Sequence, residues 1–109
     1  MTRLKITQYG ISIQAGGWDG KGDSGTDQWL GNEGNTLVDG VSCALTQSAQ
    51  KELCAKFGDT LLITYDDGST EQRIVADRAP EDDGRLDRFN AYRELSQPSD
   101  FANVVILTS

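Results

Sequence analysis

Two aspartates, Asp77 and Asp87, are the residues whose type and spacing best suit acid/base chemistry in this sequence. They stand on either side of a polar loop that contains Pro80 and Gly84. If the loop returns the chain to one place, the two carboxyl groups meet there, and paired carboxyl groups can give and take protons at a neutral polymer. The same residues also suit an acidic surface loop, so both interpretations stay open at this point.

The segments around this loop have the patterns of short strands. Alternating or continuous apolar residues predict strands, with a hairpin turn at Asp66–Ser69 between two of them. The predicted strands are Leu4–Tyr9, Val41–Leu45, Thr60–Tyr65, Glu71–Ala76 and Asn103–Leu107. A small β-barrel or an α+β domain follows from this order of elements.

One helix is predicted between the second and third of these strands. Thr46 or Ser48 can cap its start, and Ala49, Leu53 and Phe57 then share one face. Gly58 is expected to end the helix, since glycine adopts the left-handed conformation of that position. A further helical turn is expected at Phe89–Leu95.

The segment from Gly16 to Gly40 is rich in Gly, Asp and Asn and is expected to be a long loop without an element of its own. A loop of this length is often functional. It contains Trp18 and Trp29, whose rings either hold the loop to the body by burial or line a groove and stack on a sugar or peptide.

Composition restricts the partners. The chain has 109 residues, enough for one domain, and its formal net charge of −7 disfavours nucleic acid. No apolar run is long enough for a membrane span. The N-terminal residues have no apolar signal-peptide core, which predicts a protein that is cytoplasmic as synthesised.

No metal or other cofactor is expected. The sequence has no histidine and only two cysteines, Cys43 and Cys54, which either pair or remain as buried thiols. Glu81–Gly84 suggests a calcium loop, but Ala79 occupies the first ligand position of such a loop. We therefore interpret this acidic run as a solvated turn.

The order of motifs resembles the cell-wall-active branch of the six-stranded double-psi β-barrels. This branch includes the three-aspartate domain, membrane-bound lytic transglycosylase A and rare lipoprotein A, and more distantly the expansins and family 45 glycoside hydrolases. The motifs that carry the resemblance, in chain order, are Thr7-x-Tyr9-Gly10, Gly40-Val-Ser-Cys-Ala-Leu45, Gly58-x-x-Leu61-x-Ile63, Val75-Ala-Asp77-Arg78-Ala-Pro80 and Arg85-Leu-Asp87. The resemblance runs from about Leu4 to Leu107 and implies one such barrel with a short helix and a long Gly-rich loop.

The resemblance also implies roles for single residues. Asp87 falls on the family's catalytic acid/base position, and Asp77 on its other barrel aspartate, where a structural bond to backbone amides is the favoured role. Tyr9 falls on the aromatic residue that borders the groove, and Arg78 and Trp18 complete the candidate substrate-binding residues. The activity implied is lytic transglycosylase-like cleavage of the peptidoglycan glycan strand.

Two departures from the family pattern keep a second function open. Thr46 stands where the three-aspartate domains carry an acidic residue, and the histidine used by rare lipoprotein A-like enzymes is absent. The alternative is a non-catalytic structural or glycan-binding module of a phage or tailocin particle, with other virion proteins as its partners. The missing leader favours that alternative, because a virion protein reaches the cell wall without one.

Overall fold

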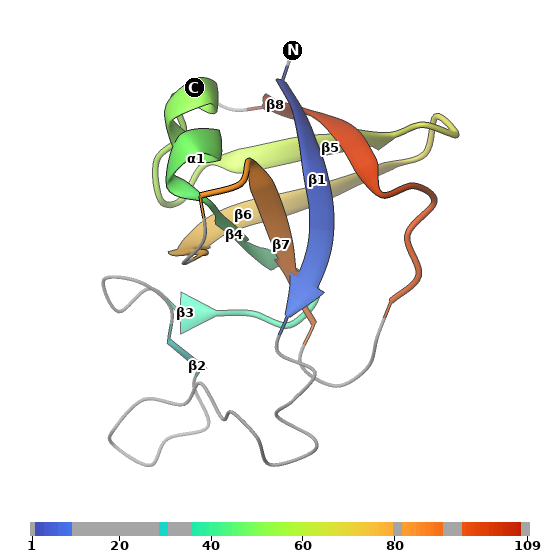
Figure 1. Cartoon of the computed structure of the whole chain (residues 1–109). Coiled ribbons are helices and arrows are strands. Elements are labelled where there is room, and N and C mark those ends of the chain that lie inside the picture. Colours follow the sequence, from blue (N-terminus) through green and yellow to red (C-terminus); the bar gives the residue numbers. More distant parts are fainter. Residues whose placement is uncertain (1, 10–28, 31–35, 80–81, 91–94, 108–109) are drawn as a thin grey trace.

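The computed structural model describes residues 2–9, 29–30, 36–79, 82–90 and 95–107, and these residues form a mainly β structure with one short helix. Six strands make up one sheet, and two very short strands pair beside it (Figure 1). The six are β1 (Thr2–Tyr9), β4 (Ser42–Leu45), β5 (Thr60–Tyr65), β6 (Thr70–Arg78), β7 (Arg85–Phe89) and β8 (Phe101–Ile106). The short strands are β2 (Trp29–Leu30) and β3 (Thr36–Leu37), and the helix is α1 (Gln47–Leu53).

The six-stranded sheet closes into a ring, in the order β1-β7-β4-β6-β5-β8, because β8 pairs with β1. Two neighbouring pairs, β1 with β7 and β4 with β6, are parallel, and the other four are antiparallel. If β1, β4 and β5 are exchanged with β6, β7 and β8 respectively, the order of the strands in the ring and their relative directions stay the same. The order and directions of the strands in the ring therefore have an approximate two-fold symmetry.

The core lies inside the ring and follows from the alternation of the strands. In β5, Leu61, Ile63 and Tyr65 are buried, whereas Leu62 and Thr64 are only partly so. Corresponding inward positions on the other strands complete one apolar cluster, which includes Leu4, Ile6, Cys43, Leu45, Val75, Leu86, Ala102 and Val104. The predicted strands are confirmed as strands, and the turn between β5 and β6 has Gly68 in the left-handed conformation, at φ 89°.

Charged side chains are also buried within the structure, among them Arg73 and Arg88. Glu71 accepts hydrogen bonds from Arg73 Nε at 2.7 Å, from Tyr65 Oη at 2.5 Å and from Arg88 Nη1 at 3.2 Å. Arg73 also donates to Asn90 Oδ1 and to two backbone carbonyls. Two buried guanidinium groups thus share one carboxylate, and that carboxylate stabilises both charges.

The helix begins as predicted but ends earlier. The Thr46 hydroxyl accepts the N–H of Ala49 and caps the start of α1. The end predicted at Gly58 is wrong: Cys54 takes the left-handed conformation, at φ 57°, and its N–H returns to the carbonyls of Gln50 and Lys51. Phe57 still packs on the core, although it reaches the core from a turn after the helix.

Other elements also differ from expectation. Phe89 belongs to strand β7 and not to a helical turn, since it pairs in register with Tyr9; residues 91–94 lie outside the described residues. The Gly-rich loop has an element of its own, because Trp29–Leu30 pairs antiparallel with Thr36–Leu37. Most of the loop, including Trp18, lies outside the described residues.

The helix and the small β2–β3 pair lie toward opposite ends of β1 (Figure 1). Leu37 of β3 packs with Ala76, Phe89 and Tyr9, which makes a second, smaller apolar cluster near the C-terminal end of β1. Within the described part of the chain, no helix is long and apolar enough to cross a membrane.

The two cysteines are not paired. Cys43 is buried in the core, and Cys54 is exposed at the end of α1. The expectation of buried thiols therefore holds for Cys43 alone.

Candidate functional site

The candidate catalytic residues lie in one row across four neighbouring strands. Thr7 of β1 pairs with Asp87 of β7, Asp87 pairs with Ala44 of β4, and Ala44 pairs with Asp77 of β6. Since Ile6 and Leu86 point into the core, their neighbours Thr7 and Asp87 point away from it. We call this outward surface of the four strands the outer face. The Cα atoms of the two aspartates are two strand spacings apart, roughly 10 Å.

Asp87 is held by two donors on the outer face. The Thr7 hydroxyl donates a hydrogen bond to Asp87 Oδ1, and Arg85 Nε donates to the same oxygen at 2.7 Å. Asp87 is 8% exposed, so its carboxylate is shielded but reachable. Hydrogen bonds and an arginine ion pair both stabilise the ionised form of a carboxylic acid.

Asp87 lines an open hollow of about 370 Å³ on the outer face, which we call the Asp87 hollow. Its walls are mostly polar and carry charges of both signs, from Lys5, Thr7, Gln8, Asp83, Arg85 and Asp87. Arg85 joins the two acidic residues, because its Nη1 also contacts Asp83 Oδ2 at 3.1 Å. A hollow with many donors and acceptors suits a hydroxyl-rich ligand better than an apolar one.

Asp77 contacts a different set of groups. The Tyr9 hydroxyl donates to Asp77 Oδ2 at 3.0 Å, and the backbone N–H of Arg78 donates to Oδ1 at 2.9 Å. Burial, followed by the negative charge of Asp77 and, more weakly, that of Asp87, raises the pKa of Tyr9 well above its ordinary value. Tyr9 therefore stays a neutral donor to Asp77, which also accepts a backbone N–H.

Tyr9 is fixed by its neighbours. Its ring packs edge-on against Phe89, with the centroids 5.3 Å apart. Tyr9 also packs against the small apolar cluster that contains Leu37.

The predicted substrate-binding residues do not all come together here. Arg78 is directed toward the helix, where its Nη2 donates to Gln50 Oε1 at 2.7 Å. It lines a separate pocket of about 420 Å³ beside α1, with Lys51 and Cys54 among the other lining residues. Trp18 lies outside the described residues.

Of the residues that line the hollow, only Asp87 was predicted as a site residue; Lys5, Thr7 and Arg85 are among those that were not. Thr7 was visible in the sequence only as the first residue of Thr-x-Tyr, and Arg85 only as one of several arginines that could pair with an acid. The alternation of β1 places Lys5, Thr7 and Tyr9 on one face, but no sequence pattern shows that β1 lies beside β7. The site therefore depends on a long-range parallel pairing.

Thr46, which stands where the three-aspartate domains carry an acidic residue, makes structural contacts. Its hydroxyl accepts the N–H of Arg85 at 3.1 Å in addition to capping α1, and its own N–H donates to the Arg85 carbonyl. Thr46 is fully buried and anchors the first residue of β7. It thus helps to position Arg85 without carrying a charge.

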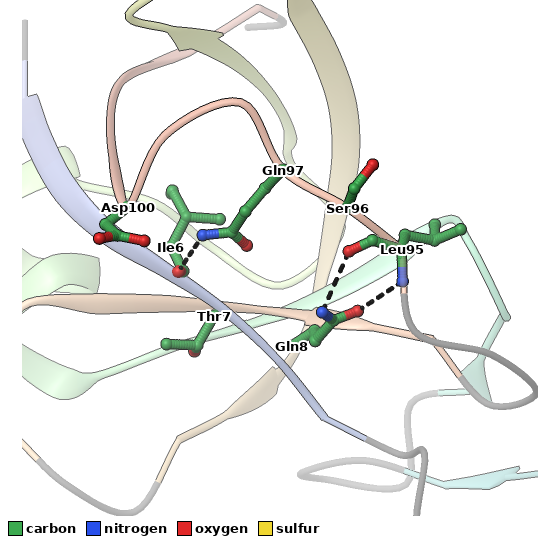
Figure 2. Close-up of a pocket in the computed structure, with 7 residues that line it drawn as sticks. All are labelled: Ile6, Thr7, Gln8, Leu95, Ser96, Gln97 and Asp100. Atoms are coloured by element: carbon green, nitrogen blue, oxygen red, sulfur yellow. Dashed lines mark hydrogen bonds between the residues drawn. The ribbon is translucent and has the colours of Figure 1, made fainter.

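A second pocket, of about 580 Å³, lies on the other side of β1 against residues 95–100 (Figure 2). The side-chain amide of Gln8 exchanges two hydrogen bonds with the backbone of Leu95, at 3.0 and 3.1 Å. Gln97 donates to the carbonyl of Ile6 at 2.8 Å. These hydrogen bonds fasten residues 95–97 to β1. We therefore interpret the polar groups of this pocket as structural and not as a ligand site.

The described residues contain no group of three or more His, Cys, Asp or Glu side chains arranged to hold a metal ion. In the acidic turn, Asp82 accepts the N–H of Ser48 at 2.6 Å and Asp83 pairs with Arg85. Both carboxylates serve local contacts, while Glu81 lies outside the described residues.

Comparison with known proteins gave no further identification: the chain matches no protein-family model, no curated protein and no solved structure.

Proposed function

We propose that this domain is a double-psi β-barrel that acts on the glycan strand of peptidoglycan, with Asp87 as the acid/base of a lytic transglycosylase-like reaction. The closed ring with two parallel pairs, related by an approximate two-fold symmetry, supports this assignment of the fold. Where the structure describes them, the residues of the sequence motifs noted above fall on the strands and turns of that ring.

One observation carries the functional proposal: Asp87 is buried at the wall of an open polar hollow, with the Thr7 hydroxyl on its carboxylate. A shielded carboxyl group beside a space for ligand is the arrangement that general acid/base catalysis requires. Thr7 orients the carboxyl group of Asp87. The hydrogen bond from Tyr9 to Asp77 joins β1 to β6 nearby.

The chemistry needs only one carboxyl group. In its acid form, Asp87 gives a proton to the glycosidic oxygen as the bond to C1 of the sugar breaks. As a carboxylate, it then takes the proton of the C6 hydroxyl of the same sugar, whose oxygen attacks C1. The product is a 1,6-anhydro sugar, and Asp87 ends the cycle with its proton restored.

The test is an analysis of products from purified peptidoglycan. We expect soluble muropeptides with 1,6-anhydro ends, identified by mass spectrometry. Fragments with ordinary reducing ends would show hydrolysis and contradict the lytic mechanism. Intact glycan after prolonged incubation would contradict the enzymatic proposal altogether.

A second candidate is a non-catalytic glycan-binding or structural module, in a virion or another assembly. The ion pair between Arg85 and Asp87 favours it, because a carboxylate held by a guanidinium is a poor proton donor. This candidate predicts that the protein sediments with peptidoglycan, or with particles that contain it, and releases no soluble fragments.

A further inference from the structure

We infer that the Asp87 hollow recognises an acidic glycan, with a carboxylate of the ligand bound between Lys5 and Arg85. The inference rests on the proposed function and adds the substrate class to it. A carboxylate bound there would also compete with Asp87 for the Arg85 guanidinium.

The first observation is the position of Lys5. Lys5 is in register with Arg85 on the neighbouring strand, so the two side chains leave the outer face side by side. Both line the Asp87 hollow. The hollow thus places two adjacent cations, Lys5 and Arg85, beside the carboxylates of Asp83 and Asp87.

The second observation is that Lys5 is exposed and its ammonium has no hydrogen-bond or ion-pair partner among the residues that the structure describes. The other charged groups of the hollow are already paired: Arg85 bonds to both Asp83 and Asp87. An anion entering the hollow therefore meets one uncommitted cation next to a second that it can share. A neutral glycan would leave Lys5 without a partner.

The third observation is that Arg85 has a fixed origin. Its backbone N–H and carbonyl both bond to Thr46, which is buried, and its guanidinium lies at the wall of the hollow, where it bonds to Asp83 and Asp87. Guanidinium groups bind carboxylates through two parallel hydrogen bonds and discriminate them from hydroxyl groups. Lys5 and Arg85 together thus form a site for one carboxylate.

The consequence concerns Asp87. The Arg85 guanidinium favours the ionised form of Asp87, and the proposed reaction begins with the protonated form. A ligand carboxylate on Arg85 offsets that positive charge, so that Asp87 takes up a proton more readily when an acidic ligand is present. Acidic glycans would then be both bound and cleaved in preference to neutral ones.

The experiment uses peptide-free glycan strands that keep the carboxylates of their muramic acid residues, and the same strands after conversion of those carboxylates to methyl esters. Binding is measured by calorimetry at low ionic strength, and cleavage by the release of 1,6-anhydro ends. The variants are Lys5→Ala, Lys5→Arg and, as the matched control, Lys56→Ala, an exposed lysine that is not among the residues lining the hollow.

We expect Lys5→Ala to weaken binding of the carboxylated strands roughly three- to fivefold, the upper part of the range of an exposed ion pair. Lys5→Arg and Lys56→Ala should bind as the unchanged protein does, and esterified strands, which lose the contacts to both Lys5 and Arg85, should bind to the unchanged protein at least as weakly as carboxylated strands bind to Lys5→Ala. Equal binding of both strands, or equal loss in Lys5→Ala and Lys56→Ala, would overturn the inference.

The two proposals fail separately. Lys5-dependent binding of carboxylated strands without cleavage supports the acidic-ligand site and contradicts catalysis. Cleavage that is the same for both strands and unaffected by Lys5→Ala supports catalysis and overturns the acidic-ligand site.

Discussion

Asp87 and Asp77 make different contacts. Asp87 accepts bonds from Thr7 and Arg85 and faces a hollow, whereas Asp77 accepts bonds from Tyr9 and from the backbone. The sequence motifs predicted different roles for the two aspartates, but they indicated neither the Thr7 contact nor the position of Lys5. Both depend on the pairing of β1 with β7, which joins residues about 80 positions apart.

Glu71 is the residue whose loss should most affect stability. We expect Glu71→Gln to lower the free energy of unfolding by about 2–4 kcal/mol, because two buried guanidinium groups then lose their shared counter-charge. The measurement is urea unfolding at neutral pH. Glu52→Gln, on an exposed part of α1, is the control and should change the free energy of unfolding little.

The same residue gives a pH dependence. Burial alone would raise the pKa of Glu71, but the hydrogen bonds of Tyr65 and Arg73 and the charges of Arg73 and Arg88 outweigh it, so the pKa lies below the ordinary 4.5. The stabilisation by Glu71 is therefore complete above pH 4.5 and is lost as the pH falls through the lowered value. Glu71→Gln should be less sensitive than the unchanged protein to acid in this range; equal sensitivity would contradict the assignment.

At the scale of elements, the strands were predictable and their neighbours were not. Alternation identified β1, β5 and most of β6, since each has one face in the core. The end of α1 was misplaced because Cys54, and not a glycine, takes the left-handed conformation. From the sequence, β7 was recognised only as a short segment that leads to Asp87. Its outward residues are buried as well as its inward ones, so the strand shows no alternation of apolar and polar residues.

Thr46 joins two elements, the start of α1 and the start of β7. Replacing it with alanine removes the cap of the helix and leaves the N–H of Arg85 without its acceptor. We expect Thr46→Ala to lower the free energy of unfolding by about 1–3 kcal/mol, as loss of a cap and of a buried hydrogen bond implies. Thr46→Ser keeps the hydroxyl and should be affected less; equal losses in the two variants would show that the methyl group matters and not the hydrogen bonds.

At the scale of the whole molecule, the closed ring makes its interior reachable only by unfolding. Every strand of the ring has two neighbours, so no edge opens independently. The core thiol of Cys43 reports on this, since burial raises its pKa to about 12. The exposed thiol of Cys54 is an internal reference in the same chain.

We expect one thiol per chain to react quickly with a thiol reagent in the native protein, and two in denaturant. The single-cysteine variants Cys43→Ala and Cys54→Ala assign the fast thiol to Cys54 and the slow one to Cys43. Rapid native labelling of Cys43 would contradict a closed ring.

The central claim is that Asp87 transfers the proton in cleavage of a glycan strand, and the most direct measurement is the rate of release of 1,6-anhydro ends by Asp87→Asn. The asparagine keeps the shape of the side chain and can still accept from Thr7, but it cannot donate and accept a proton in turn. Asp66→Asn, which removes an exposed carboxylate from the turn after β5, is the matched control. We predict at least a hundredfold loss for Asp87→Asn, the order of magnitude of general acid/base catalysis, and no loss for Asp66→Asn. Equal rates for Asp87→Asn and the unchanged protein would contradict the claim.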